Sequence, residues 1–355
     1  MRIDQLVPAF HHGDAIGDTA FHMKKVFLSR GFQSEIYCLT HDSCLKEESK
    51  PFDSFQNPAS SDITILHFAL PSPLTNAFIN MPGKKVIIYH NITPPEFFNG
   101  FSEDMGRICH LGRDELLTLV PHVSLALADS EFNRKELLEL GFHRAEVFPL
   151  FIDFERYKKP ASNFMYEFFR EDRTNVLFVG RIVPNKKIDE LIKVIFYYKK
   201  YISPLVRLII VGKTSSLPKY YQSLVCLADE FYLNPEEICF TGHISDEEMY
   251  ALYKVSDVFL SLSEHEGFGL PFVESMIFDL PIVAYDCTAV PYTLGEAGIL
   301  IKDKRVDYIG ELVHIVAHDN KLREEIIRGQ RKRLKEFKDL ELEKFLLKSL
   351  DSLIQ

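Results

Sequence analysis

One stretch of the chain decides the fold, and it reads Ser261-Leu262-Ser263-Glu264-His265-Glu266-Gly267-Phe268-Gly269-Leu270-Pro271-Phe272-Val273-Glu274. A predicted strand ends near Leu262, a glycine-rich turn follows, and Pro271 stands where the first position of a helix would be. The two glycines permit a tight backbone that comes close to a ligand. A helix that begins here directs unpaired N–H groups, and the positive end of its dipole, towards whatever the turn holds. The stretch therefore predicts a strand–turn–helix unit built to bind a ligand.

Two carboxylates flank this turn. Glu266 lies before it and Glu274 lies in the predicted first helical turn, so both side chains can face one ligand. Carboxylates accept hydrogen bonds from neutral hydroxyl groups, which suggests a sugar or a ribose. For either residue alone the alternative is a helix-capping glutamate beside a surface glutamate.

A second motif, Val179-Gly180-Arg181-Ile182-Val183-Pro184-Asn185-Lys186-Lys187, follows another predicted strand and opens an amphipathic helix. Open α/β sheets bind ligands on loops at the carboxyl ends of their strands. Two positive charges on such a loop suit a diphosphate, because arginine can make bidentate contacts and lysine acts as a point charge. The alternative is a solvated surface loop.

Short apolar runs alternate with amphipathic segments along the whole chain. The predicted strands are Glu35–Leu39, Ile63–Phe68, Val86–His90, Val123–Ala128, Val176–Val179, Leu208–Val211, Ile238–Thr241, Val258–Leu262 and Ile282–Tyr285. Their mostly apolar composition suits parallel strands that are covered on both faces. The pattern predicts an α/β protein with parallel sheets.

The length of 355 residues suggests about two domains. A cluster of Pro, Ser and Asn at Lys158-Lys159-Pro160-Ala161-Ser162-Asn163 marks the expected break. Leucine and phenylalanine at helical spacing predict a final helix over about 338–355.

Charge and cysteine content exclude several classes of protein. The formal charge is −10, and residues 1–150 carry 13 basic against 19 acidic side chains, so a nucleic-acid partner is not expected. The six cysteines include no C-x-x-C pair, so no zinc or redox motif is predicted. No apolar run reaches the ~18–20 residues of a membrane span, and the start lacks the apolar core of a signal peptide. We expect a cytoplasmic protein, with room for peripheral membrane contact at the inner face.

The motifs together resemble a known family. Glu266-Gly267-Phe268-Gly269-Leu270-Pro271 with Glu274 forms E-x7-E, and Val179-Gly180-Arg181 with Lys186 precedes it. This arrangement is similar to the retaining glycosyltransferases of group 1 (family 4), which have the GT-B fold, and the resemblance covers most of 174–303. It implies two Rossmann-like domains facing each other across a cleft: 1–155 on the acceptor side and 156–337 binding a nucleotide-sugar. The helix at 338–355 would pack back on the first domain.

The resemblance also implies roles for the donor-binding residues. Glu274 would hold the ribose, while Glu266 and the backbone at Gly267, Phe268, Gly269 and Leu270 would bind the donor sugar. Arg181 and Lys186 would neutralise the leaving diphosphate. An ungapped alignment puts Lys187 where the family usually has glycine, and Lys187 is the second candidate for the phosphate lysine. Gly212 and the loop with His243 and Ile244 fall where the family cradles the base.

The first half of the chain holds nine of the thirteen histidines. His90, at the end of a predicted strand, resembles the family histidine that reaches the transferred sugar; the alternative is a structural histidine. The first βα loop carries Gly13, Asp14 and Gly17 ahead of a predicted helix at Thr19–Arg30, in place of the family's adjacent glycines. Asp14 would either orient an acceptor hydroxyl or cap a turn.

The implied reaction moves a sugar from a nucleoside-diphosphate sugar to an acceptor hydroxyl with retention, in glycan or polysaccharide biosynthesis. No cofactor is expected, and the sequence contains no D-x-D motif that would require a metal. The alternatives are a nucleotide-sugar epimerase or phosphorylase of the same architecture, and a catalytically silent glycan- or nucleotide-binding subunit. A nicotinamide-dependent oxidoreductase is disfavoured because no G-x-G-x-x-G follows the first strand. The nucleotide, the sugar, the acceptor and the oligomeric state are left open.

Overall fold

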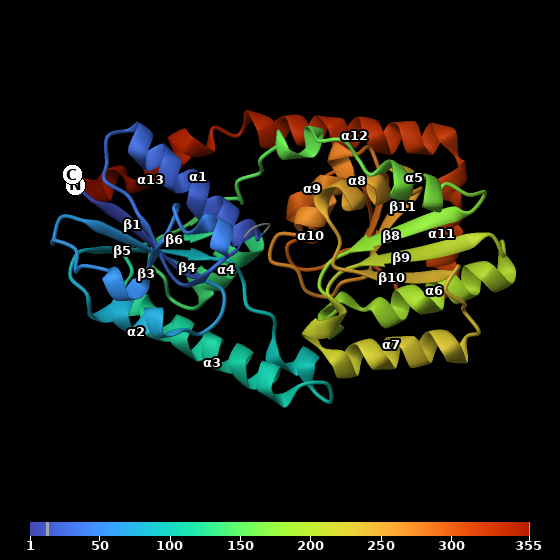
Figure 1. Ribbon diagram of the computed structural model, residues 1–355, viewed down its shortest axis with the longest axis horizontal. Coiled ribbons are helices and arrows are strands. Elements are labelled where there is room, and N and C mark those ends of the chain that lie inside the picture. The colour runs from blue at the N-terminus through green and yellow to red at the C-terminus, as the bar shows by residue number, and fades with distance from the viewer. Residues whose placement is uncertain (12–13, 355) are drawn as a thin grey trace. The chain divides into compact units, whose positions relative to one another are not determined.

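The computed structural model describes residues 1–11 and 14–354, and of Cys44 the backbone alone. These residues form two compact units. Unit 1 contains Met1–Glu96, Asp104–Ile152 and the chain from Leu340 onward, and unit 2 contains Phe97–Glu103 and Asp153–Asp339. Each unit is built on one parallel sheet (Figure 1), which confirms the predicted α/β class.

The sheet of unit 1 has the strand order β3-β2-β1-β4-β5-β6-β7. Every neighbouring pair is parallel. Its strands are β1 (Ile3–Phe10), β2 (Ile36–His41), β3 (Lys50–Pro51), β4 (Ile63–Phe68), β5 (Lys84–Tyr89), β6 (Leu125–Ala128) and β7 (Ala145–Val147). All six residues of β4 are buried, as expected of a parallel strand covered on both faces.

The sheet of unit 2 has the order β10-β9-β8-β11-β12-β13, again with parallel pairs throughout. Its strands are β8 (Thr174–Val179), β9 (Val206–Val211), β10 (Ile238–Gly242), β11 (Val258–Ser261), β12 (Ile282–Tyr285) and β13 (Ile299–Ile301). Figure 1 shows these strands between α8 and α9 on one side and α6 and α7 on the other.

The helices follow the strands in the order that a doubly wound fold requires. In unit 1 they are α1 (Ala15–Ser29), α2 (Pro73–Asn80), α3 (Glu103–Leu119), α4 (Glu131–Glu139) and α13 (Leu342–Ile354). In unit 2 they are α5 (Asn163–Phe169), α6 (Ile188–Tyr201), α7 (Pro218–Glu230), α8 (Asp246–Val255), α9 (Leu270–Ile277), α10 (Val290–Leu294), α11 (Val306–His318) and α12 (Asn320–Asp339).

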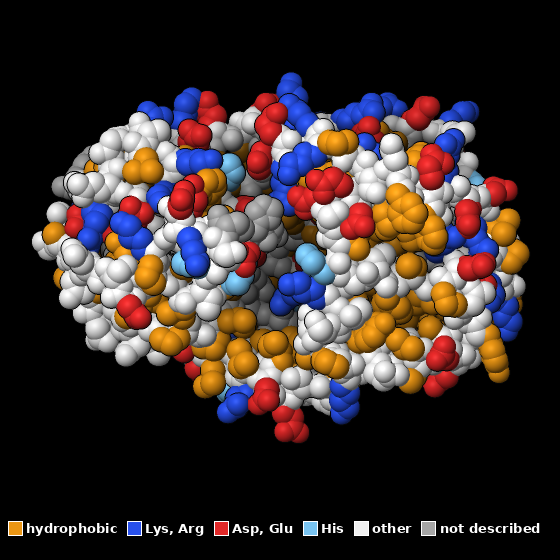
Figure 2. Space-filling view, in the orientation of Figure 1, with side chains coloured by type: hydrophobic (Ala, Val, Ile, Leu, Met, Phe, Trp, Pro, Cys, Tyr) orange, Lys and Arg blue, Asp and Glu red, His pale blue; other side chains and the backbone are white. Residues whose placement is uncertain are grey.

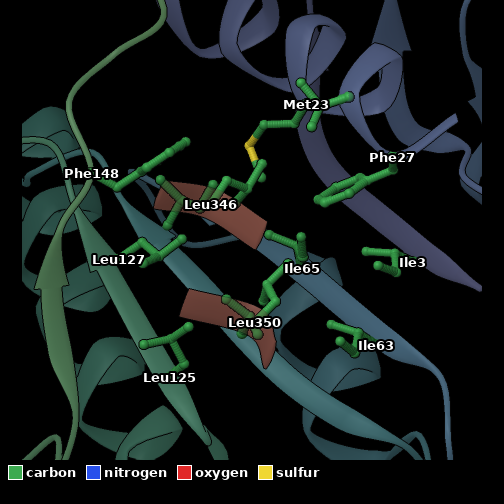
Figure 3. Packing of buried hydrophobic residues seen from close by; sticks show 13 residues of the cluster. Ile3, Met23, Phe27, Ile63, Ile65, Leu125, Leu127, Phe148, Leu346 and Leu350 are labelled. Atoms are coloured by element: carbon green, nitrogen blue, oxygen red, sulfur yellow. The ribbon is translucent and has the colours of Figure 1, made fainter. Parts of the chain in front are cut away.

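The last helix completes the core of unit 1 (Figure 3). Leu346 and Leu350 of α13 are fully buried and pack with Met23, Phe27 and Phe148. The final helix begins at Leu342, later than the expected 338, because α12 continues to Asp339. Burying two leucines stabilises this part of unit 1 by about 1.5–3 kcal/mol for each side chain.

Both sheets reverse their strand order at one point, between β1 and β4 in unit 1 and between β8 and β11 in unit 2. Open α/β sheets bind ligands outside the carboxyl ends of the strands that flank such a reversal. The two motifs that the sequence singles out follow β8 and β11, so unit 2 places both at its own reversal point.

Candidate functional site

The strongest candidate site lies on the loops that follow β8 and β11 in unit 2. Lys186 and Glu266, 80 positions apart in sequence, meet here with Nζ 2.6 Å from Oε1. Their side chains keep only 13% and 11% of their exposure, so solvent screens the pair weakly. The structure thus brings together one predicted residue from each motif.

Arg181 lies on the same loop as Lys186, and its side chain is exposed. Within the described residues it has no carboxylate partner at ion-pair distance. A guanidinium group in this position can make bidentate contacts with an anionic ligand.

The loop Ser263–Glu266 is held by two neighbouring loops. Asn185 accepts the Glu264 N–H at 2.8 Å and donates from Nδ2 to the His265 carbonyl at 2.9 Å. On the other side, the Glu266 N–H donates to Thr288 Oγ1 and the Cys287 thiol donates to the Ser263 carbonyl, both at 2.9 Å. Sequence reasoning missed Asn185, Cys287 and Thr288, because a side chain that binds backbone leaves no motif.

Lys187 has a backbone requirement of its own. Its φ of 52° and ψ of 43° lie in the left-handed region, which favours glycine. This is the position where the family usually has glycine. Burial lowers the pKa of Lys187, but the carboxylates of Asp189, Glu190 and Glu264 outweigh burial and raise it overall.

Lys304 is a further cation that the sequence analysis missed. Its ammonium lies 2.8 Å from Glu264 and 2.9 Å from Glu190, and it also sits over the Tyr285 ring at 4.4 Å. Lys187 lies 3.6 Å from the same Glu190. Alternating charges of this kind hold one another in place next to the Lys186–Glu266 pair.

The glycine turn leads into α9 as predicted. Gly269 has a φ of 87°, and a Cβ atom there would lie 2.5 Å from the Phe272 ring, so only glycine fits. The Thr293 hydroxyl donates to the Phe268 carbonyl at 2.6 Å and holds the turn. Gly267 and Leu270 complete it, and the N-terminus of α9 points its dipole at this edge of the sheet.

Glu274 lies deeper, on α9, and is 5% exposed. Tyr157 and Tyr253 donate to its two carboxylate oxygens at 3.0 Å and 2.8 Å. Burial raises the pKa of Glu274, while the two tyrosine hydrogen bonds lower it. No contact joins Glu274 to Glu266 among those described, so the two glutamates of E-x7-E occupy different surroundings.

The remaining predicted donor residues follow β9 and β10. The Gly212 N–H donates to the Gly242 carbonyl at 3.1 Å, and a Cβ atom at Gly212 would lie 1.9 Å from the Gly180 carbonyl oxygen. This close approach joins the loops after β8, β9 and β10. His243 is exposed and Ile244 is half-buried beside it.

In unit 1, His90 belongs to a chain of hydrogen bonds that crosses the sheet. Its Nδ1 lies 2.9 Å from Asp129 Oδ2, and its Nε2 lies 3.1 Å from His67 Nδ1. His67 Nε2 lies 3.0 Å from Gln5 Oε1. Gln5, His67 and Asp129 come from three other strands or loops, so no sequence motif links them to His90.

The Gln5 amide decides which group donates and which accepts in this series of hydrogen bonds. Its Nε2 donates to the Ala20 carbonyl at 2.9 Å, so Oε1 accepts from His67 Nε2. Burial lowers the pKa of His67 well below its ordinary value, and the neutral ring accepts from His90 Nε2 through Nδ1. His90 Nδ1 and the Asp129 carboxyl group therefore share a single proton.

The first βα loop is described in part. Gly13 lies outside the described residues. Asp14 is the N-cap of α1 and accepts the Ile16 N–H at 3.4 Å, so the helix begins at Ala15 and not at the expected Thr19. Gly17 lies inside the first turn of α1, where a Cβ atom would lie 3.0 Å from the His11 carbonyl.

The surface shown in Figure 2 carries charges of both signs. Acidic and basic side chains are interspersed over the face shown in Figure 2. Among the described helices, none has the length and apolarity needed to cross a bilayer. Within residues 1–11 and 14–354, no group of three His, Cys, Asp or Glu side chains is placed to hold a metal ion.

Comparison with known proteins gives the family of unit 2. Residues 163–333 match the family described as glycosyl transferases group 1. This region belongs to the group 1 glycosyltransferases. The match contains Arg181, Lys186, Glu266 and Glu274. Of the residues described above for the site in unit 2, all but Tyr157 lie within the matched region.

Relatives and solved structures extend this result. The chain is 28% identical over 120 residues to the serotype-specific mannosyltransferase WbdA of Escherichia coli, a match that covers 34% of this chain and 14% of that protein. It is 33% identical over 87 residues to the O-antigen chain mannosyltransferase B of Escherichia coli, covering 24% and 23%. The match therefore spans less than a quarter of each relative's length.

The fold is similar over the full chain to HepE of Anabaena, solved in complex with UDP-glucose. The TM-score is 0.77 with 17% identity, and the match covers 99% of this chain and 100% of that one. With the two parallel sheets, this likeness shows the GT-B fold.

Proposed function

We propose that this protein is a retaining glycosyltransferase that moves a hexose from a nucleoside-diphosphate sugar to an acceptor hydroxyl in the synthesis of a glycan or polysaccharide. The observation that carries the proposal is the Lys186–Glu266 pair at the strand-order reversal of a group 1 region. In this pair the Lys186 ammonium would bind the diphosphate, and the neighbouring Glu266 carboxylate would bind sugar hydroxyls. A lysine ammonium has three N–H donors, so Lys186 can keep its hydrogen bond to Glu266 and still donate to a phosphate oxygen.

The names of related proteins support the substrate class. Two relatives are named as mannosyltransferases, and the similar HepE structure holds UDP-glucose. We propose a nucleoside-diphosphate hexose as donor. Glu274 would face the ribose, and Gly212, His243 and Ile244 would border the base.

In the proposed reaction the acceptor oxygen attacks the anomeric carbon on the face that the diphosphate leaves. The bond from the anomeric carbon to the phosphate oxygen breaks, and the acceptor proton passes to that oxygen. Arg181 and Lys186 would stabilise the negative charge that develops on the leaving group, which is the main catalytic effect of such cationic groups. His90, Asp14 and Gly17 remain the proposed acceptor-side residues of unit 1.

Thermal unfolding with UDP-, GDP- and ADP-sugars tests the donor. A donor present at about 100 times its Kd stabilises the folded protein by about 2.7 kcal/mol, so the correct nucleotide raises Tm above the others. No shift with any nucleotide-sugar would contradict donor binding. Conversion of the donor to an isomer in the absence of an acceptor would indicate an epimerase. Cleavage of a glycan that depends on phosphate would indicate a phosphorylase.

Arg181→Ala tests the leaving-group role. We expect kcat to fall about 100-fold or more while Tm stays near that of the wild type, because the exposed side chain packs against little. Arg305→Ala, an exposed arginine of the same unit, is the matched control and should leave kcat unchanged. Near-wild-type turnover of Arg181→Ala would overturn this role.

A further inference from the structure

Thr288 is held in a backbone conformation that its side chain disfavours. It lies on the loop after β12 with a φ of 43°, in the left-handed region. For a β-branched residue this is an outlier, because the branched Cβ is crowded against the backbone. Glycine would adopt the same backbone freely. The threonine backbone at this position is therefore strained.

That side chain closes a short relay of hydrogen bonds. The Glu266 N–H donates to Thr288 Oγ1 at 2.9 Å, and the Thr288 hydroxyl donates to Cys287 Sγ at 3.7 Å. The Cys287 thiol donates in turn to the Ser263 carbonyl at 2.9 Å. Two consecutive side chains thus join the two ends of the loop Ser263–Glu266.

The direction of these hydrogen bonds is fixed, because the Glu266 N–H can only donate and the Ser263 carbonyl can only accept, while the Thr288 hydroxyl and the Cys287 thiol each accept one bond and donate one. The relay needs a protonated thiol, and burial raises the pKa of Cys287 to about 11. Glycine at position 288 would remove the backbone strain, but the Glu266 N–H would lose its hydrogen bond to the Thr288 hydroxyl. Valine would keep the shape and lose the donor and acceptor.

We propose that Thr288 is a positioning residue that holds Glu266 against Lys186. This inference rests on the proposed function, because it assigns Glu266 to the donor sugar. The Glu266 amide is bonded to Thr288 while the Glu266 carboxylate lies 2.6 Å from Lys186. Releasing the amide lets the carboxylate move, and small displacements of a group that positions substrate reduce turnover strongly.

The test compares Thr288→Ser, Thr288→Val and Thr288→Gly. Serine keeps the hydroxyl, and we expect its kcat to stay within about threefold of the wild type. Valine and glycine should lower kcat about 10-fold or more. Thr288→Gly should do so with an unchanged or higher Tm, because it relieves the left-handed backbone. Tyr232→Gly, at an exposed residue with φ 52°, is the control for strain relief and should leave kcat unchanged.

Hydrogen–deuterium exchange at the Glu266 amide is measured on the same variants without donor. Valine and glycine should speed that exchange about 10-fold or more, and serine should leave it slow. Full kcat in Thr288→Gly, or slow exchange in Thr288→Val, would overturn the positioning role. If the wild type uses no donor, the proposed function fails, and the exchange result alone decides whether Thr288 holds the Glu266 loop.

Discussion

His90 and Asp129 lie side by side in unit 1, with Nδ1 2.9 Å from Oδ2 and only 3% and 4% of their side chains exposed. Because His67 accepts from His90 Nε2, the proton between His90 and Asp129 belongs to the pair. The pair is neutral as a whole, which is the form that a buried site tolerates best. Both ring nitrogens of His90 therefore bind protein groups.

Asp129→Asn should be well tolerated. The asparagine amide can donate to a neutral His90 and keep every hydrogen bond, so we expect the free energy of unfolding to change by less than about 1 kcal/mol. Asp129→Leu leaves His90 Nδ1 without a partner and should cost about 2–3 kcal/mol. Urea unfolding at pH 7 measures both. Equal losses in the two variants would show that the carboxylate charge, and not the hydrogen bond, holds His90.

Substitutions of the two neighbouring lysines, Lys186 and Lys187, should have very different effects on kcat. Lys186→Met removes the partner of Glu266 and the proposed phosphate contact, so kcat should fall about 100-fold or more. Lys187→Gly relieves a left-handed backbone and should raise the free energy of unfolding by up to about 1 kcal/mol with little loss of kcat. Steady-state kinetics with the preferred donor checks both. If Lys187→Gly lost more kcat than Lys186→Met, the proposed phosphate contact would belong to Lys187 and not to Lys186.

Asp4 should make stability depend on pH. Burial raises the pKa of Asp4 to about 6 from 3.8, although Arg2 lies 2.9 Å away and opposes the shift. The folded state therefore binds the proton more tightly than the unfolded state, and stability falls as pH rises from about 4 through about 6. This change amounts to about 3 kcal/mol.

Asp4→Asn removes this dependence. Relative to the wild type, the variant should gain about 2–3 kcal/mol between pH 4 and pH 7.5, measured by urea unfolding at each pH. Asp53→Asn, which removes a carboxylate from an exposed residue, is the control for the change in net charge. The same difference from the wild type at both pH values would rule out a titrating Asp4.

Much of the architecture follows from local sequence. The strands predicted at Ile63–Phe68 and Ile282–Tyr285 have the observed bounds, because short β-rich apolar runs between turn residues specify a buried parallel strand locally. The amphipathic helix predicted after the second motif is observed as α6, whose buried face contains Ile188, Leu191 and Ile192. Helix starts were less predictable. Asp14 caps α1, so the helix begins at Ala15 and not at the expected Thr19.

The contacts within the candidate site depend on tertiary structure. Lys186 and Glu266 are visible as residue types in two motifs, but their contact requires β8 to pair with β11, where Val176 lies opposite Val258. Thr288 and Asn185 could not be found from sequence, since their side chains bind backbone groups of other residues, and every residue type carries such groups. Gln5, His67 and Asp129 act through their own side chains, and four parallel strands are needed to bring them and His90 into one series of hydrogen bonds.

The sequence by itself determined the α/β class and the two candidate loops with their residue types, because these depend on local spacing and composition. Only the tertiary structure decided which groups are paired, which are buried and which backbone is strained. Strand pairing joins residues far apart in the chain, and burial raises the energy of any charge left without a partner.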